Sequence, residues 1–308
     1  MKTISELEKE LNDLLSNTES IVQEIVTRMC NGEKSAILEM SKTSSALTLM
    51  LVDINPSFMD TLIEKDYLDK VIQKWIIKTG NFEWIEKLVS KDCFDTGLHK
   101  MVVELGNIDI IQKLLKRKDL NKEVQVDIFE IGNEQLNNLL VKRKDLTAEM
   151  QVMFAKTHDN DIIEILLEHK VLCKEAQKVI FNTNNHNFQK ELLERDDLHR
   201  SLHLSFAKNS SGDKDFMNTL LEKANLTHDA QREIAKRSNP EYLNRLIDRD
   251  DLDETAEYWI ASSKKEDVIE NLLNNRTYLR ERALYYLYIH YKDKYKDILK
   301  DKFGYFAT

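Results

Sequence analysis

A leucine-rich segment recurs at a nearly constant spacing along this chain and gives the clearest pattern among its hydrophobic positions. The segment reads LLKRKDL at Leu114–Leu120, LVKRKDL at Leu140–Leu146 and LLEHKVL at Leu166–Leu172, so the step is 26 residues. Its first leucine returns at Leu62, Leu88, Leu114, Leu140, Leu166, Leu192, Leu220, Leu246 and Leu273. Self-similarity of this length is typical of chains in which one short structural unit is stacked many times.

Two further apolar columns keep the same register. A large apolar residue stands six positions after the first leucine in every copy, and another stands fourteen positions after it. Within one copy, apolar residues spaced three and four apart indicate two amphipathic helices. A lone helix pair cannot bury both of its apolar faces, whereas stacked pairs form a continuous core. The pattern therefore predicts an all-α fold, an α-solenoid (superhelix) of about nine 26-residue two-helix repeats with helical caps.

The first clear copy predicts one helix over Asp69–Thr79 and another over Phe82–Lys91, joined at Gly80-Asn81. Glycine at this place can adopt the left-handed conformation that ends a helix, and asparagine can cap the helix that follows. Residues suited to cap the first helix of a copy are Asp69, Asp95, Asn121, Thr147 and Thr227. The aspartate that often precedes the seventh-position leucine is expected to accept amide hydrogen bonds at the same helix start.

Three regions are predicted along the chain. Residues 1–57 are expected to form an N-terminal helical cap with one degenerate repeat, residues 58–290 the α-helical repeat array, and residues 291–308 a C-terminal capping segment rich in aromatic residues. The N-terminal region has amphipathic patterns over Glu6–Leu15 and Ile21–Met29. Caps of this kind shield the last core layer of a repeat array from water.

Several segments resemble known helical repeats. Asp145–Ala155 and Leu226–Ala235 are similar to bacterial leucine-rich-variant and HEAT-like short α-helical repeats, and Gly106–Leu115 resembles the second helix of an ankyrin repeat. The likeness covers about residues 58–290. The chain departs from both models, because it lacks the prolines of leucine-rich-variant units and the Thr-Pro-Leu-His start of ankyrin units. The resemblance implies macromolecular binding along one face, which is an analogy of fold.

Composition supports a helical, intracellular protein. The 308 residues include only seven glycines and two prolines, the residues that most often break helices. The formal net charge of −9 argues against a chain that is basic as a whole, as many nucleic-acid binders are. Cys30, Cys93 and Cys173 are isolated and form no disulfide framework, which favours a reducing compartment. With no apolar signal segment or membrane-spanning run, the expected location is cytoplasmic, without membrane association.

A basic column lies three positions after each first leucine. It reads Lys65, Lys91, Arg117, Arg143, His169, Arg195, Lys223, Arg249 and Arg276. One interpretation is an anionic partner along the stack; the other is charge that complements the carboxyl end of each second helix. Adjacent basic residues in the middle copies make the best candidate patch. The candidate partner-binding residues are Lys116, Arg117, Lys118, Lys142, Arg143, Lys144, His169, Lys170, Arg195 and Arg249.

A second polar column lies eleven positions after the first leucine. It reads Gln73, His99, Gln125, Gln151, Gln177, His203 and Gln231, and Glu257 then interrupts it. Gln and His can donate and accept at once, so these side chains are expected to bond loop carbonyls or the neighbouring copy. His199 and His203 have the spacing of helical metal ligands, but no third ligand is near them in sequence. The sequence predicts no metal, no cofactor and no catalytic residue, since phosphate-loop and nucleophile-elbow motifs are missing.

These observations favour a non-catalytic scaffold that binds another protein along one face of the solenoid, with an acidic protein as one option. Nucleic-acid binding through the basic turns of the middle copies is the alternative. A hydrolase or glycosylase of the HEAT-like repeat type is a third hypothesis, because two carboxylates could still meet in a groove. Trp75 and Trp259 share one column, thirteen positions after the first leucine, whose other members include polar residues. That column is expected to be partly exposed, and the sequence leaves the oligomeric state open.

Overall fold

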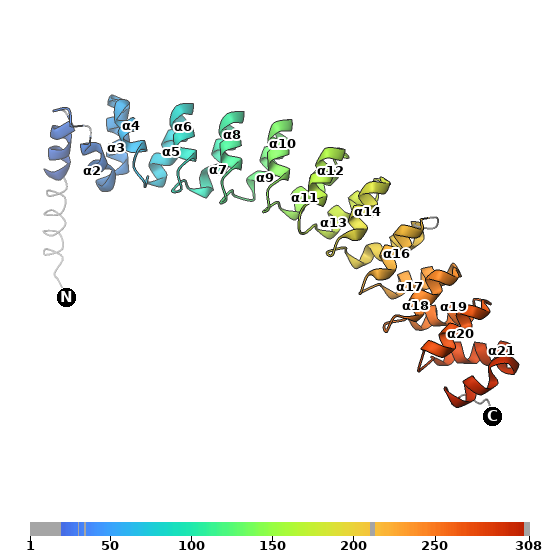
Figure 1. Cartoon of the computed structure of the whole chain (residues 1–308). Helices are drawn as coiled ribbons and strands as arrows, with labels where there is room; N and C mark the ends of the chain where they lie inside the picture. Colours follow the sequence, from blue (N-terminus) through green and yellow to red (C-terminus); the bar gives the residue numbers. More distant parts are fainter. Residues whose placement is uncertain (1–19, 30, 34, 210–212, 305–308) are drawn as a thin grey trace, which may run out of the picture. The chain divides into compact units, whose positions relative to one another are not determined.

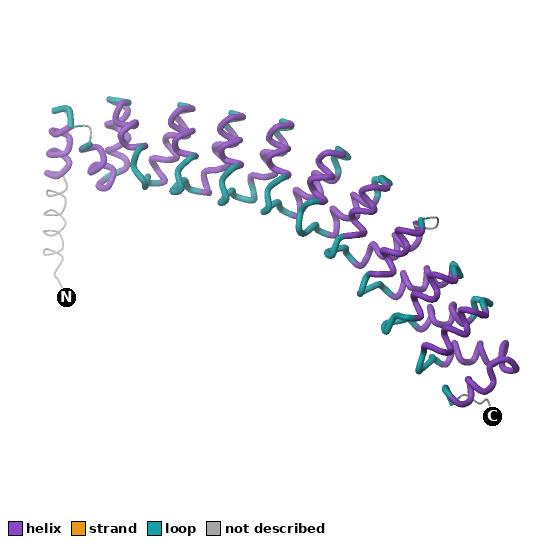
Figure 2. The backbone as a smooth tube through the Cα atoms, in the orientation of Figure 1, coloured by secondary structure: helices purple, strands orange, loops and turns teal. Residues whose placement is uncertain are grey.

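The structure, a computed structural model, describes residues 20–29, 31–33, 35–209 and 213–304. It divides into two compact units between Met150 and Gln151. Within the described residues both units are helical and contain no strand (Figure 2). The predicted helix over Glu6–Leu15 lies outside the described residues, as does Cys30.

The first unit begins with a helix at residues 20–29 and continues as a run of short helices. Their bounds are α2 Ala36–Thr43, α3 Ser45–Ile54, α4 Ser57–Ile63, α5 Lys70–Thr79, α6 Phe82–Val89, η1 Thr96–Leu98, α7 His99–Glu104, α8 Ile108–Leu115, α9 Val124–Glu130 and α10 Glu134–Val141. Helix α5 packs on α6 and α7 packs on α8, and each pair also packs on the next one. The first helices α5, α7 and α9 form one row and the second helices α6, α8 and α10 form another (Figure 1).

The second unit repeats this arrangement. Helix α11, Ala148–Ala155, crosses the division. The helices after it are α12 Asn160–Leu167, α13 Lys174–Phe181, α14 His186–Glu194, η2 Arg200–Leu202, α15 His203–Asn209, α16 Lys214–Glu222, α17 His228–Lys236, α18 Pro240–Ile247, α19 Glu254–Ala261, α20 Glu266–Asn275 and α21 Glu281–Asp301. Contacts run along the first helices from α15 to α21 and along the second helices from α12 to α20. Helices that pack on their neighbours in sequence order are consistent with the predicted α-solenoid.

The apolar columns of the sequence are the core of both units. The leucine that begins each predicted repeat is completely buried at all nine positions. The residue six positions later is at most 8% exposed, and the residue fourteen positions later at most 1%. Leu120, Leu146 and Leu172 are therefore buried to a similar degree, each in its own helix pair. Each large apolar side chain buried in these columns stabilises the fold by roughly 2 kcal/mol relative to an exposed one.

The predicted helix boundaries are confirmed at the loops between paired helices. Gly80, Gly106 and Gly132 have φ angles of 68°, 68° and 70°, the left-handed region in which a side chain would be strained. The side chains of Asn81, Asn107 and Asn133 then accept backbone N–H bonds at the start of the next helix. At the first helices, the side chains of Asp69, Asp95, Thr147 and Thr227 accept equivalent bonds.

Candidate functional site

Arg117, from the predicted basic column, points into the stack of the first unit. Its Nη1 donates to the carbonyl oxygens of Val89 and Lys91 at 2.7 and 2.6 Å, where α6 ends. Its Nε and Nη2 bind both carboxylate oxygens of Asp119 at 2.8 and 2.7 Å. The side chain is only 10% exposed. Arg117 therefore neutralises the carbonyl end of the preceding second helix.

Arg143 makes the same contacts one helix pair later. Its Nη1 donates to the carbonyl oxygens of Leu115 and Arg117, the latter at 2.9 Å. Asp145 receives the other two guanidinium bonds at 2.9 and 2.8 Å. The two turns that follow α8 and α10 are thus bonded to each other through one arginine. A bidentate arginine–carboxylate pair fixes geometry better than a lysine could.

The second unit repeats the arrangement. Arg195 donates to the carbonyl oxygens of Leu167 and His169, and it pairs with Asp197 at 2.7 Å. Arg249 donates to three carbonyl oxygens around the end of α16 and pairs with Asp251 at 2.8 Å. These contacts agree with the second interpretation of the basic column, in which it complements helix ends. The four guanidinium groups named among the candidate partner-binding residues are engaged within the fold.

One expectation about this turn is wrong. The aspartate before the seventh-position leucine is expected to accept amide bonds at the following helix start, but Asp119, Asp145, Asp197 and Asp251 hold the guanidinium two residues earlier. Asp197 does accept a backbone N–H, that of Leu172 in the preceding helix pair, at 2.7 Å. The sequence contained a signal for this pairing: Arg in the basic column is followed two residues later by Asp in four copies, and copies with Lys or His there have no Asp.

The exposed basic groups of the candidate patch are its lysines. Lys116, Lys118, Lys142 and Lys144 are all exposed in the first unit. Within the described part of the chain, the structure shows no ion pair or hydrogen bond for any of these four ammonium groups. In the second unit Lys170 is exposed and His169 is half-buried. The structure thus divides the predicted patch into inward-facing arginines and outward-facing lysines.

The Gln/His column is buried and links consecutive helix pairs. The amide nitrogen of Gln231 donates to the carbonyl oxygens of Leu226 and Asp251, each at 3.2 Å. Its Oε1 accepts the backbone N–H of Asp253 at 2.8 Å. One side chain therefore closes its own helix start and that of the next pair. Gln73 and Gln177 make the same three contacts, which confirms the predicted structural role.

The two histidines of this column fit the position less completely. His99 accepts the backbone N–H of Asn121 through Nδ1 at 3.1 Å, which places the proton on Nε2. Among the described residues, His99 Nε2 and His203 Nδ1 are buried without a hydrogen-bond partner. Burial lowers the pKa of each imidazole to about 4. Both rings are consequently neutral at pH 7.

Glu257 stands in the same column at the last helix pair. Its Oε1 accepts the backbone N–H of Arg280 at 2.6 Å, as the glutamine oxygen does elsewhere. A carboxylate cannot donate, and the Arg280 guanidinium supplies the missing donor to Leu252 O at 2.8 Å. Arg280 also pairs with Glu257 at 3.3 Å. Burial nevertheless raises the pKa of Glu257, because desolvation outweighs the neighbouring cation.

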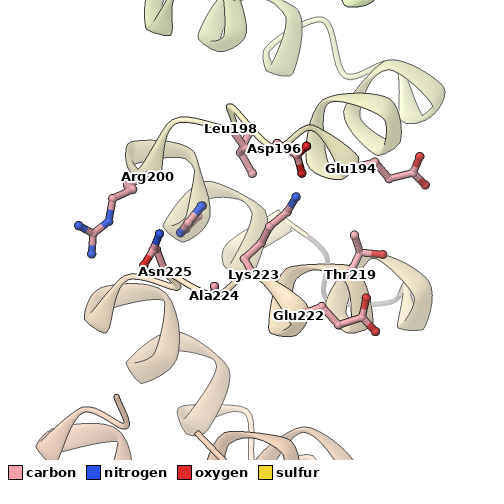
Figure 3. A pocket seen from close by; sticks show the side chains of 10 residues that line it. Glu194, Asp196, Leu198, Arg200, Thr219, Glu222, Lys223, Ala224 and Asn225 are labelled. Carbon is pink, nitrogen blue, oxygen red and sulfur yellow. The ribbon is translucent and has the colours of Figure 1, made fainter. Parts of the chain in front are cut away.

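A surface hollow of about 650 Å³ lies where the second unit departs from this scheme (Figure 3). Lys223 occupies the place of the column arginine, and its ammonium donates to a single carbonyl, that of Arg195, at 2.9 Å. Asn225 occupies the place of the paired aspartate. The Lys223 side chain extends toward the turn that carries Asp196, while Arg200 points away (Figure 3). The hollow mixes both charges, and burial lowers the pKa of Lys223.

An aromatic surface covers the outward side of α19 and α21. The Tyr258 ring meets Trp259 and Tyr286 edge to face, at centroid distances of 5.6 and 5.8 Å. The Arg282 guanidinium lies 4.1 Å from the centroid of Tyr258. Trp259 is 36% and Tyr285 59% exposed. The repeat pattern predicts partial exposure of Trp259 but not the cluster, although aromatic residues recur at the same two positions of consecutive copies.

Trp75 stands at the same repeat position as Trp259 but has a different environment. Its ring stacks on Trp84 at 6.4 Å, and Trp84 Nε1 donates to Asp60 at 3.1 Å. The two histidines with metal-ligand spacing make other contacts: His199 accepts the backbone N–H of Ser201, and His203 is buried. Across the described ranges no group of three or more His, Cys, Asp or Glu side chains could hold a metal ion. No helix there is both long and apolar enough to cross a membrane.

Comparison with known proteins yields no relative. The chain matches no protein-family model, no curated protein and no solved structure. Its function is therefore inferred from the geometry of the two units.

Proposed function

We propose that this chain is a non-catalytic scaffold that binds another protein along the outward face of its first helices. This face comprises the residues twelve and thirteen positions after each first leucine. In the first unit they are Lys74, Trp75, Lys100, Met101, Val126 and Asp127. In the second unit they are Val152, Met153, Lys178, Val179, Leu204, Ser205, Arg232, Glu233, Tyr258, Trp259, Tyr285 and Tyr286.

The observation that supports the proposal is the contrast between constant and variable columns. Some columns stay constant from copy to copy, including the Gln/His column and the arginine–aspartate pairs. Their side chains make the hydrogen bonds and ion pairs that connect consecutive helix pairs. None of the residues on the first-helix face is buried, and their chemistry changes from copy to copy. A stack needs no such variety for its own stability, whereas a partner is recognised by it.

The aromatic surface of α19 and α21 supports a protein partner in particular. Tyr, Trp and Arg are the residues that contribute most often to binding hot spots between proteins. Trp259, Arg282 and Tyr286 each contact the ring of Tyr258, so part of the side-chain freedom of this cluster is already lost before binding. Preorganised aromatic groups bind at a smaller entropic cost.

The proposal includes the finer architecture: about nine 26-residue repeats over residues 58–290, with the segments outside this range acting as caps. Aromatic packing in α21 is in keeping with a cap, since Tyr295 is 5% exposed and Leu299 1%. The predicted boundaries near residues 57 and 290 remain predictions, and so does the cytoplasmic location.

Site-specific photocrosslinking in the cells that make the protein tests this function. A benzophenone amino acid would replace Tyr285 or Lys178 on the first-helix face and, as matched exposed controls, Asn187 or Glu270 on the second-helix side. We expect a discrete protein adduct from the first two positions and not from the controls. Equal adduct patterns from both faces, or no protein adduct from the first-helix face, would contradict the proposal.

A further inference from the structure

Two consecutive turns of the first unit reverse the charge found at the same places elsewhere. The turns after α8 and α10 carry Lys116, Lys118, Lys142 and Lys144, which we call the lysine edge. The equivalent residues are otherwise mostly acidic: Glu64, Asp66 and Asp92 in the first unit, and Glu194, Asp196, Asp248 and Asp250 in the second. The charge reversal is confined in the first unit to two neighbouring turns.

The first turn of the lysine edge is hydrogen-bonded to the turn that follows it. Arg143 donates to the carbonyl oxygens of Leu115 and Arg117, the residues on either side of Lys116. Asp119 and Asp145 are the acidic residues of these turns, and each is paired with its own arginine. The arginine–aspartate pairs cancel, so the four lysines remain as the uncompensated charge. The backbone around Lys116 is bonded in place by Arg143 before any partner arrives, which lowers the entropic cost of binding there.

A groove opens beside the first of these turns. It has a volume of about 630 Å³ and lies between the ends of α6 and α8, lined by Val89, Ser90 and Asp92 after α6 and by Lys113, Lys116, Arg117, Lys118 and Asp119 at the end of α8. Lys113 is paired with Glu86 and Asp119 with Arg117, so Lys116, Lys118 and Asp92 are the lining charges without an ion pair among the described residues. The groove combines apolar surface with ammonium groups along one rim. A segment of extended chain could place backbone in such a groove while its anionic side chains reach the lysines.

We propose that the lysine edge binds an acidic, extended segment of the partner protein. Packed helices lie about 8–10 Å apart. In an extended segment of polyproline-II geometry, side chains three residues apart lie on one face about 9 Å apart, so carboxylates at that spacing reach successive turns. This proposal rests on the proposed function only in that the partner is a protein, because the edge lies on the turns and not on the first-helix face.

The surrounding charge favours a short acidic peptide over nucleic acid. Exposed carboxylates of Asp109, Glu134 and Glu149 lie in the first turns of α8, α10 and α11, and that of Glu123 immediately precedes α9. Duplex DNA carries one charge per about 1.7 Å of its axis and would extend over them. The chain as a whole has a net charge of −9. A segment with a few carboxylates matches the four lysines without meeting these repulsive neighbours.

Fluorescence anisotropy with the full chain tests the proposal. The probes are a labelled twelve-residue peptide rich in Asp and Glu, the same peptide with Asn and Gln in their place, and a single-stranded DNA and RNA of twenty nucleotides. The edge variant is Lys116→Glu/Lys142→Glu. The control is Lys42→Glu/Lys78→Glu, on α2 and α5, which changes the charge of the same unit equally at exposed lysines outside the first-helix face. Thermal unfolding of each variant checks that the fold is kept.

We expect the acidic peptide to bind the wild-type chain, the Asn/Gln peptide to bind at least tenfold more weakly, and the edge variant to lose about tenfold in affinity. The control variant should stay within about twofold. Equal weakening in both variants, or no binding of the acidic peptide at low salt, would overturn the proposal. Oligonucleotides that bind more tightly than the peptide and depend on the same lysines would overturn it too, in favour of a nucleic-acid site.

The two proposals fail separately. If the first-helix face gives its adducts in the edge variant and the peptide does not bind, the scaffold function stands and the lysine edge is excluded. If the acidic peptide binds at the edge but no adduct forms from Tyr285 or Lys178, the first-helix face is excluded instead.

Discussion

In the second unit, helices α17 and α15 carry different side chains at the same position of the Gln/His column. In α17, Gln231 makes three hydrogen bonds, which close the start of α17 and that of α19. In α15, His203 occupies this position, and within the described residues its Nδ1 is buried without a hydrogen-bond partner. Both side chains are almost completely buried. The apolar columns therefore suffice to stack the helices, and the polar residue adds to stability in proportion to the bonds it completes.

Removing the three hydrogen bonds of Gln231 should have the largest effect on stability. Replacing Gln231 with Leu keeps the approximate volume but leaves two carbonyls and one N–H without their partner. Each such group costs on the order of 1 kcal/mol or more, so unfolding should become easier by about 3 kcal/mol. Urea unfolding followed by hydrogen exchange of α17 and α19 measures this. Lys236→Ala, at an exposed position of the same helix, is the control and should change stability by less than about 0.5 kcal/mol.

The contribution of His203 to stability should depend on pH. The folded-state pKa of His203 is about 4, below the ordinary value near 6.5, so the folded chain binds fewer protons between these values. Stability is therefore full above about pH 6.5 and falls as the pH drops toward 4. Between pH 7 and pH 5, His203 should account for a loss on the order of 2 kcal/mol.

The matched variant for this prediction is His203→Gln. It should flatten the pH dependence of urea unfolding over the same range and, at pH 7, leave stability unchanged or raised by up to about 1 kcal/mol through the added hydrogen bonds. An unchanged slope in the variant would show that His203 does not titrate as its burial implies. His99 should behave in the same way in the first unit, since its pKa is also lowered to about 4.

A third version of the position, Glu257 with Arg280, sharpens the comparison. Arg280→Ala removes both the donor to Leu252 and the cation beside a buried carboxylate. We expect a loss of about 1.5 kcal/mol, moderated because the Arg280 side chain is 37% exposed. In a Glu257→Gln background the same change should cost less than half as much, because Gln supplies its own donor. Equal losses in both backgrounds, measured in a double-mutant cycle, would contradict the pairing.

The smallest effect concerns the other contact between helix pairs. Arg249→Lys would convert an arginine–aspartate pair into the arrangement that Lys223 already has, with fewer bonds to carbonyl oxygens. The expected loss is about 1 kcal/mol by urea unfolding. The reverse change, Lys223→Arg together with Asn225→Asp, should raise stability by a similar amount. No gain from the double change would mean that the hollow beside Lys223 has a cause other than these two residues.

Particular residues show how much of the structure the repeat pattern could predict. The column of first leucines, the left-handed glycines and the asparagine caps follow from local rules, because helix ends and apolar faces depend on residues a few positions apart. The bonding role of Gln231 was also predictable, since a buried residue that both donates and accepts must find partners. Arg117 and Lys118 were placed in one candidate patch, and only the structure separated them. Their neighbours in sequence are nearly the same, and the difference lies in the preceding turn, 26 residues away.

The sequence alone determined that short paired helices stack in order, because the spacing of apolar residues sets which faces must leave water. The tertiary structure decided which polar groups are used up within the stack and which stay at the surface. That choice depends on carbonyls and carboxylates brought close by neighbouring helix pairs. It therefore also decided which side chains of the aromatic surface of α19 and α21 and of the lysine edge remain exposed.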